Sequence, residues 1–327
     1  MNGSPAPLLE IRDLDVRFRV SGGSVHAVRG LDLTIARGEV AAIVGESGSG
    51  KSATMLAVLG LLDPNASVTG SAKLDGLELI GAPGAVLRKI RGGRIGMIFQ
   101  DPMTSLNPVL TVGRQIAEAV ITHQRISPGD AEKKAVELLE MVAMPSAKDR
   151  ARTYPHELSG GMRQRVMIAM ALANEPDILI ADEPTTALDV TIQAQILQVL
   201  RDLQRVRALT VVLITHDLGV VAGLADRVHV MYAGKVVEGG PVIDIFHRPN
   251  HPYTTGLLAS LPRLDRPERE LTPIGGTPPS LRDDPEGCAF APRCPYAIER
   301  CTQHLPTLQP VGDLQVACDV LPLTSAR

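Results

Sequence analysis

The chain has 327 residues, of which 44% are apolar and 21% charged, enough for one large domain and a smaller one around a substantial buried core. The formal net charge is −3 without a dense basic block, aromatic residues make up 2% and tryptophan is absent, which argues against a nucleic-acid groove, a base-stacking surface or a polybasic membrane anchor. No apolar stretch is long enough to cross a bilayer, and the N-terminus lacks a signal-peptide pattern, so we expect a cytosolic protein with reduced thiols.

The first part of the chain predicts an α/β core preceded by antiparallel strands. LLEIRDLDVRF, from Leu8, and then GLDLTIARGE alternate apolar and polar residues, as half-exposed antiparallel strands do. Short apolar runs rich in valine and isoleucine predict buried strands: VAAIVG (40–45), RIGMIFQ (94–100), DILIADE (177–183) and LTVVLITH (209–216). Because helical patterns separate these runs, we expect crossover connections and a mainly parallel sheet.

Two further segments depart from this strand–helix alternation. Between Asp101 and Leu158 the pattern is helical, and AEKKAVELLEMVAM (131–144) places apolar residues at helical spacing. We therefore expect a helical subdomain, about residues 101–172, inserted into a core that spans residues 8–240. From Pro241 onward the chain contains 14 of its 25 prolines, which predicts a small proline-rich extension over residues 241–327.

GESGSGKS (45–52) follows an apolar strand and leads into a helical run, as the phosphate-binding loop G-x4-G-K-[ST] does. Lys51 can reach the β and γ phosphates, the Ser52 hydroxyl can ligate Mg²⁺, and the backbone N–H groups can surround the anion. The alternative is a chance turn rich in glycine and serine, against which the preceding strand argues. The candidate nucleotide-binding residues of this loop are Gly45, Glu46, Ser47, Gly48, Ser49, Gly50, Lys51 and Ser52.

Two further motifs suit a nucleotide site. In ILIADE, Asp182 can hold Mg²⁺ and Glu183 can orient or deprotonate the attacking water, because the carboxyl ends of strands in open α/β sheets are where ligands bind. Ser159, Gly160 and Gly161 precede a helical run, where a hydroxyl and free N–H groups suit a phosphate. Taken alone, Glu183 could be a solvated strand end and Ser159 an ordinary N-cap.

Together these motifs resemble the ATP-binding cassette (ABC) family of transport ATPases over about residues 8–240. The phosphate loop, Gln100 after an apolar strand, LSGGM, ILIADE, TALD at Thr186 to Asp189, and His216 after the next strand occur in the order of that family. The family motif LSGGQ is changed here at Met162, but its serine and both glycines are kept, so we expect little loss of phosphate binding.

The resemblance implies an ATPase that uses ATP and Mg²⁺ at the shared face of two such subunits, copies or paralogues. Each ATP would lie between one phosphate loop and the Ser-Gly-Gly of the other subunit. Gln100 would sense Mg²⁺ and the attacking water, His216 would contact the γ-phosphate, and Asp189 would link the two sites, so that catalysis consists mostly of positioning and charge stabilisation. Phe18 would stack on adenine, unless it is a core strand residue, and His216 could be an ordinary strand-end histidine.

The tail resembles the C-terminal extension of oligopeptide and dipeptide importer ATPases. RPNHPYTTGLLASLP (248–262), PIGGTPPSL (273–281) and GCAFAPRCPYAIERC carry this resemblance, together with QDPMTSLNPVLTVGRQI from Gln100. It implies a peripheral protein at the cytoplasmic face of the cell membrane that powers peptide import through two permease subunits, served by an extracytoplasmic solute-binding protein and without nucleic acid. Importers of nickel or glutathione carry similar tails, and a soluble cassette protein in DNA or ribosome work is an alternative from another class.

All four cysteines lie in the extension, at Cys288, Cys294, Cys301 and Cys318. Their spacing, C-x5-C-x6-C-x16-C, is not the paired C-x2-C of common zinc modules. Four thiolates can hold a [4Fe–4S] cluster or Zn²⁺, and the resemblance to the peptide importers implies the cluster; zinc, no metal and a redox-sensing module are the alternatives. Because we expect the phosphate loop to lie in a separate core, ATP binding should not depend on these cysteines.

Overall fold

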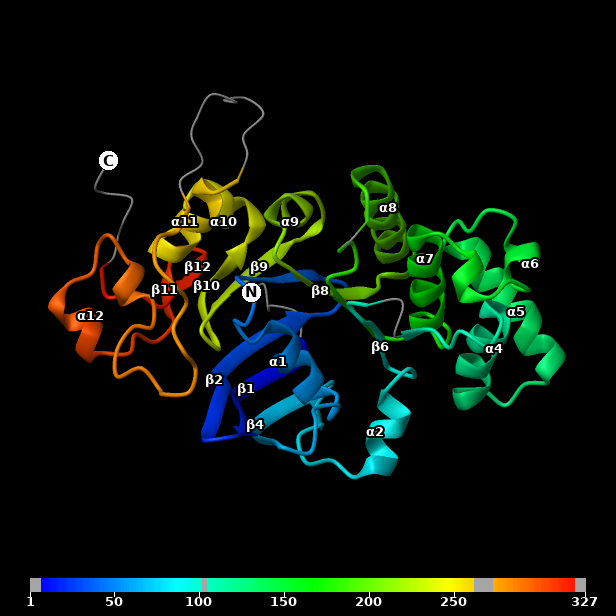
Figure 1. Ribbon diagram of the computed structural model, residues 1–327, viewed down its shortest axis with the longest axis horizontal. Helices are drawn as coiled ribbons and strands as arrows, with labels where there is room; N and C mark the ends of the chain where they lie inside the picture. Colours follow the sequence, from blue (N-terminus) through cyan, green and yellow to red (C-terminus); the bar gives the residue numbers. More distant parts are fainter. Residues whose placement is uncertain (1–6, 102–104, 187, 262–272, 321–327) are drawn as a thin grey trace, which may run out of the picture. The chain divides into compact units, whose positions relative to one another are not determined.

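The computed structural model describes residues 7–101, 105–186, 188–261 and 273–320 (Figure 1). The chain forms two compact units. The first unit comprises Met1–Ala36, Ala41–Gly81 and Thr215–Arg327, and the second comprises Arg37–Val40 and Ala82–Ile214. The phosphate loop and the four cysteines therefore belong to the first unit, whereas Gln100, Glu183 and the Ser-Gly-Gly motif belong to the second.

An antiparallel sheet forms the N-terminal part of the first unit, as predicted. Its strand order is β2-β1-β4-β5, with β1 Pro7–Val20, β2 Gly23–Ala36, β4 Ala66–Leu74 and β5 Leu77–Glu78. Leu9, Ile11 and Val16 of β1 are fully buried, whereas Arg12 and Arg19 are exposed. The alternation is interrupted between Ile11 and Leu14, where the pairing with β2 shifts register at a bulge.

The remaining strands of the first unit form a mixed sheet, so the prediction of a mainly parallel sheet is wrong for this part. The order is β11-β12-β10-β9-β3, with β3 Val40–Val44, β9 Arg227–Tyr232, β10 Lys235–Pro241, β11 Gln309–Val311 and β12 Leu314–Val316. β3 is parallel to β9, but the other pairs are antiparallel. β9 and β10 pair in this way because Ala233 and Gly234, at φ of 48° and 80°, form a two-residue hairpin turn.

The helices of the first unit are short: α1 Lys51–Val58, α9 Leu218–Leu224, α10 Val242–His247, α11 Pro252–Ala259, the 3₁₀ turn η2 Ala291–Arg293 and α12 Glu299–Gln303. Most of them lie in the proline-rich extension. There they alternate with segments that have no regular structure, and the extension adds β11 and β12 to the edge of the mixed sheet.

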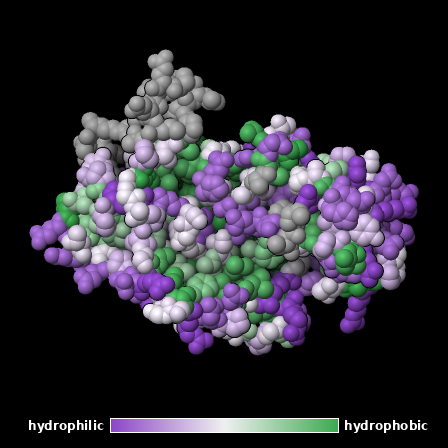
Figure 2. Space-filling model, in the orientation of Figure 1, coloured by the Kyte–Doolittle hydropathy of each residue, from purple (hydrophilic) through white to green (hydrophobic). Residues whose placement is uncertain are grey.

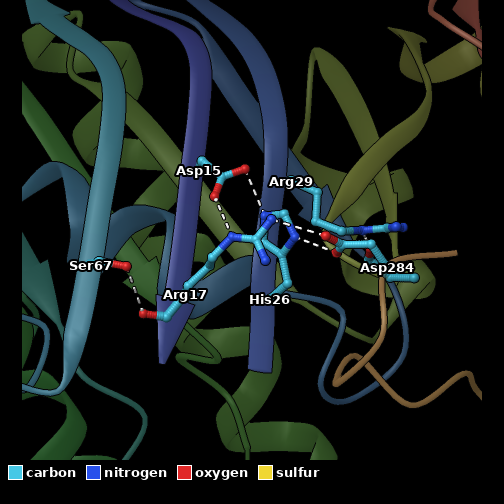
Figure 3. A network of polar contacts seen from close by, with 7 residues as sticks. Asp15, Arg17, His26, Arg29, Ser67 and Asp284 are labelled. Atoms are coloured by element: carbon cyan, nitrogen blue, oxygen red, sulfur yellow. Dashed lines mark hydrogen bonds and ion pairs between the residues drawn. The ribbon is translucent and has the colours of Figure 1, made fainter. Parts of the chain in front are cut away.

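The extension is also bound to the antiparallel sheet, through a polar network around His26 (Figure 3). Nδ1 of His26 lies 2.5 Å from Oδ1 of Asp284, its Nε2 lies 2.6 Å from Oδ2 of Asp15, and Arg17 donates to Asp284 at 3.0 Å. Burial alone would raise the pKa of Asp284, but the hydrogen bonds from His26 and Arg17 outweigh it and lower that pKa. The extension therefore contacts the antiparallel sheet through charged and polar side chains.

The second unit combines a parallel sheet with a group of helices. The sheet has the order β8-β7-β6, with β6 Ile95–Ile98, β7 Ile178–Asp182 and β8 Thr210–Thr215, and every residue of β7 and β8 is buried. The helices are α2 Gly84–Ile90, α4 Val112–His123, α5 Pro128–Met141, α6 Ala147–Arg150, the 3₁₀ turn η1 Pro155–Glu157, α7 Gly160–Ala171 and α8 Val190–Arg207. The helices α4 to α7 pack side by side, as Figure 1 shows in green.

Local signals explain where the helix α5 begins and which side it buries. Ser127 is its N-cap and accepts a hydrogen bond from the backbone N–H of Asp130, and Pro128 occupies the first turn. Ala131, Ala135 and Leu138 are buried, at the helical spacing seen in the sequence. The helix predicted over residues 131–144 is thus confirmed, with its end at Met141.

Within the described residues, no helix combines the length and the apolar character that a bilayer crossing requires. On the face drawn in Figure 2, hydrophobic side chains lie in patches among hydrophilic ones.

Candidate functional site

The phosphate loop makes a tight turn between β3 and α1. Gly50 is the N-cap of α1 at a φ of 99°, and a Cβ at this position would lie 2.4 Å from the carbonyl oxygen of Ala27. Any side chain would therefore collide with the backbone of β2 as well as strain the turn. This is the physical reason for a glycine directly before Lys51.

Lys51 lies folded over the loop that precedes it. Its Nζ donates to the carbonyl oxygens of Gly45 at 2.8 Å and Glu46 at 2.9 Å, and it lies 3.5 Å from Oγ of Ser49. Lys51 is only 6% exposed, whereas Ser47 and Gly48 at the tip of the loop are exposed. The loop thus holds a buried ammonium group beside the first turn of a helix, whose dipole also attracts anions.

The acids of the second unit lie at the carboxyl end of β7. Asp182 is the last residue of the strand and is 5% exposed. Glu183 has a φ of 47°, in the left-handed region, and its backbone N–H donates to the carbonyl of Ile214 at 2.8 Å. Its carboxylate oxygen Oε2 accepts from Nε2 of Gln100 at 3.0 Å and from the Thr186 hydroxyl at 2.8 Å. The structure therefore brings together two predicted site residues, Gln100 and Glu183, and adds Thr186.

The Ser-Gly-Gly motif begins helix α7. Ser159 is the N-cap, and its hydroxyl accepts from the backbone N–H of Met162 at 3.4 Å. Ser159 and Gly160 are exposed, so their polar groups are accessible to an anion. Gly161 is buried, and a Cβ there would lie 2.4 Å from Cγ2 of Ile192 in α8. The second glycine is thus required by helix packing.

The other candidates lie at the ends or edges of elements. Asp189 is the exposed N-cap of α8, with its side chain accepting from the backbone N–H of Ile192 at 3.0 Å, and the neighbouring Ala187 lies outside the described residues. His216 is exposed and directly follows β8. Phe18 lies on β1, opposite Val25 of β2, and is partly exposed, so it is not among the fully buried residues of that strand.

Comparisons with known proteins agree with this combination of motifs. Residues 28–186 match the family model described as ABC transporter, and residues 237–301 match the one described as oligopeptide/dipeptide transporter, C-terminal region. The oligopeptide transport ATP-binding protein OppD of Bacillus subtilis is 53% identical over 94% of this chain and 86% of its own length. The dipeptide transport ATP-binding protein DppD of the same organism is 54% identical over 91% and 90%. The chain belongs to the oligopeptide and dipeptide group of the ABC transporter family.

Two further comparisons concern length and fold. OppD of Mycobacterium tuberculosis is 53% identical over 98% of this chain, but the chain spans only 53% of that relative, about half its length. The dimeric structure of a bacterial ABC transporter cassette, MJ0796, matches with a TM-score of 0.65 and 32% identity, covering 72% of this chain and 98% of that one. A dimeric post-hydrolysis state of the same cassette, bound to ADP and phosphate, matches equally well.

The four cysteines of this ABC transporter chain line one small cavity, together with His251 and Asp319. All four thiols are free, and burial raises the pKa of Cys288 and Cys294, and that of Cys318 to about 11. Among the described side chains, no three of histidine, cysteine, aspartate or glutamate are grouped so that they could hold a metal ion. The predicted metal site is therefore not shown: the thiols line a common cavity, but among the described residues they do not form a group that could hold one metal ion.

Two residues of the ABC chain that were not predicted from the sequence contact the phosphate loop. Tyr253 of α11 accepts a hydrogen bond from the backbone N–H of Glu46 at 2.8 Å. Arg293 of η2 pairs with the Glu46 carboxylate through both terminal nitrogens, at 2.8 and 3.0 Å. Their distance from Glu46 along the sequence, 207 and 247 residues, leaves no spacing pattern that could reveal them.

Proposed function

We propose that this chain is the ATP-hydrolysing subunit that powers import of oligopeptides or dipeptides through a separate membrane permease. The observation that carries the peptide assignment is the match of residues 237–301, which include much of the extension, to the oligopeptide/dipeptide transporter model. The same chain also contains a phosphate loop and matches the ABC transporter model. The names of the B. subtilis relatives, which refer to oligopeptide and dipeptide transport, support the same solutes over nickel or glutathione. They also favour a transporter over a soluble cassette protein in DNA or ribosome work.

In this proposal the domains are an ATPase cassette over residues 8–240, with its helical subdomain at about residues 101–172, and the extension over residues 241–327. The cassette works as a dimer with a copy or a paralogue, which the dimeric form of the 32% identical cassette supports. It lies at the cytoplasmic face of the membrane, peripherally bound to two permease subunits that an extracytoplasmic solute-binding protein serves.

Each nucleotide is held by the phosphate loop of one subunit, with Phe18 against adenine, and by Ser159, Gly160 and Gly161 of the other.

Within each site the residues divide the chemistry of phosphoryl transfer to water. Lys51 stabilises the charge of the β and γ phosphates. Ser52, Gln100 and Asp182 would hold Mg²⁺, which would neutralise charge that develops on the phosphate oxygens. Glu183 orients or deprotonates the attacking water, since its carboxylate is held at one oxygen by two donors.

Three further residues of the proposal lie around this centre. Gln100 positions Glu183 and would also hold Mg²⁺, since its Nε2 donates to the Glu183 carboxylate. His216 contacts the γ-phosphate, and Asp189 links the two sites of the dimer.

The permease is expected to dock on residues 100–107, because ATP-driven movement of the helical subdomain must be transmitted somewhere. Residues 102–104 of this segment lie outside the described residues. Phe99 and Val109, which flank the segment, are apolar and yet 42% and 74% exposed, as a contact surface for a short helix requires.

A photo-crosslinking amino acid at position 105, in place of Ser105, should therefore join the chain to a permease subunit in native membranes. The matched control is the same substitution at Lys133, which is exposed on α5. Mass spectrometry of the crosslinked product identifies the partner. Crosslinks from position 133 as strong as those from position 105, or products that contain only ribosomal proteins, contradict the proposal.

We also propose that the four cysteines hold a [4Fe–4S] cluster, with zinc as the alternative metal. The shared cavity supports a common ligand for the four thiols. One zinc ion with four Zn–S bonds of about 2.3 Å would need all four sulfurs grouped around one point, whereas a cluster spreads them over four irons. A cluster would supply a structural link within a region that has little core of its own.

Anaerobically purified protein should be brown and contain about four irons per chain if all four thiolates bind one cluster. Cys294→Ser should bleach the colour and lower the iron content, because one ligand is lost. Elemental analysis decides the outcome: one zinc without iron identifies a zinc site instead, and neither metal after anaerobic preparation leaves four reduced thiols and refutes both metals.

A further inference from the structure

The side chain of Arg293 lies mostly inside the first unit. It is 4% exposed, and all five of its N–H donors have acceptors. Nη1 and Nη2 each donate to one oxygen of the Glu46 carboxylate, Nη1 also donates to Tyr232 at 3.1 Å, and Nε donates to the carbonyl of Gly275 at 2.9 Å. The carbonyl of Ile274 accepts the remaining N–H at 3.4 Å.

Aromatic rings hold the guanidinium group in place. Its central carbon lies 5.8 Å from the ring centre of Tyr232 and 5.9 Å from that of Phe290. Phe290 packs in turn against Tyr232 and Tyr253, with ring centres 5.3 and 5.4 Å apart. Contact with Glu46 raises the pKa of Arg293 further, so the group is always charged.

The partner of Arg293 lies in the phosphate loop itself. Glu46 is the second residue of the phosphate loop, so it places a carboxylate beside a site whose ligand carries several negative charges. A like charge so close to a triphosphate weakens binding unless a cation neutralises it. Lys51 is directed to the carbonyl of Glu46, whereas the carboxylate is paired with Arg293.

We propose that Arg293 is a positioning residue of the ATP site, contributed by the extension, and that it neutralises Glu46 and fixes the phosphate loop. Tyr253 acts with it, because it accepts the Glu46 backbone N–H and so holds the same residue from a second side. The bidentate pair fixes both the charge and the orientation of the carboxylate. Since Arg293 lies between Cys288 and Cys294, the cysteine segment tunes the affinity of the site for ATP.

The inference rests on the proposed function only in taking residues 45–52 as the nucleotide-binding loop, and a double-mutant cycle tests it. Equilibrium binding of MgATP to the full chain is measured for the wild type, Arg293→Met, Glu46→Gln and the double variant. Arg293→Met should raise the Kd at least about tenfold, because it leaves an unpaired carboxylate beside the phosphates. In the double variant the Kd should return to within about threefold of the wild type, because the repulsive charge is gone.

Steady-state kinetics provide a second readout, in which Arg293→Met should raise KM for ATP and change kcat by less than about twofold. Arg282→Met is the matched control. Arg282 lies in the same extension but is exposed, and its substitution removes the same positive charge. Arg293→Lys, which keeps the charge but not the bidentate geometry, should have an intermediate Kd.

The outcomes separate an electrostatic role from a merely structural one. An Arg293→Met effect of equal size in the Glu46→Gln background, or no effect in a folded protein, overturns the proposal. If Arg293→Met does not fold, the Kd values of Arg293→Lys and Glu46→Gln for MgATP test the proposal instead. A wild-type Kd for Arg293→Lys then counts against the proposal. Failure of the wild type to bind MgATP would instead refute the proposed function.

Discussion

Glu183→Gln is expected to lower steady-state ATP hydrolysis by about 100-fold or more, the range over which general bases contribute to catalysis. Glutamine is nearly isosteric with glutamate and can still accept from Gln100 and Thr186, but it cannot take a proton from water. Binding of MgATP should therefore persist, and the ATP-bound dimer should accumulate. Phosphate release and size-exclusion chromatography with MgATP measure the two effects.

Thr186 offers a matched control for Glu183→Gln. Thr186→Val removes a donor to the Glu183 carboxylate without changing the acid itself. It should slow hydrolysis by less than Glu183→Gln does, since Gln100 still holds the same oxygen. Near-normal turnover in folded Glu183→Gln would contradict the assigned role, whatever the result for Thr186→Val.

Lys51→Met should weaken MgATP binding at least about tenfold, because a hydrogen bond to a charged group contributes about 1.5–3 kcal/mol. Methionine keeps most of the apolar stem, so the loss is mainly that of the ammonium group, which is buried at the centre of the loop. Lys73→Met is the control, since Lys73 is exposed on β4 and carries the same charge. Titration calorimetry measures both variants, and equal affinities for the two would show that Lys51 does not contact phosphate.

Much of the secondary structure could be predicted from the sequence because the signals were local. The strands β3, β7 and β8 are buried throughout, so continuous apolar runs marked them clearly. Ser159 sits at the start of a helix, as its residue type and its neighbours indicated. The phosphate loop was recognisable for the same reason, since its turn geometry requires glycine within a few residues of Lys51.

Features that depend on distant contacts could not be predicted. The mixed sheet arises because β9 and β10 form a hairpin and the extension adds β11 and β12, and none of these short strands has a long apolar run. The pair between Glu46 and Arg293 joins residues 247 positions apart. A composition change near Pro241 suggested a separate extension, yet Asp284 binds His26 and Arg293 binds the phosphate loop.

Uptake of a labelled dipeptide or oligopeptide tests the central claim most directly. Cells that lack this chain are supplied with the wild type or with Glu183→Gln, and uptake of peptide, nickel and glutathione is compared. The account predicts that the wild type restores peptide uptake, that Glu183→Gln does not, and that uptake of nickel and glutathione is the same in all strains. Peptide uptake that is unchanged without the chain, or restored equally by Glu183→Gln, would contradict it.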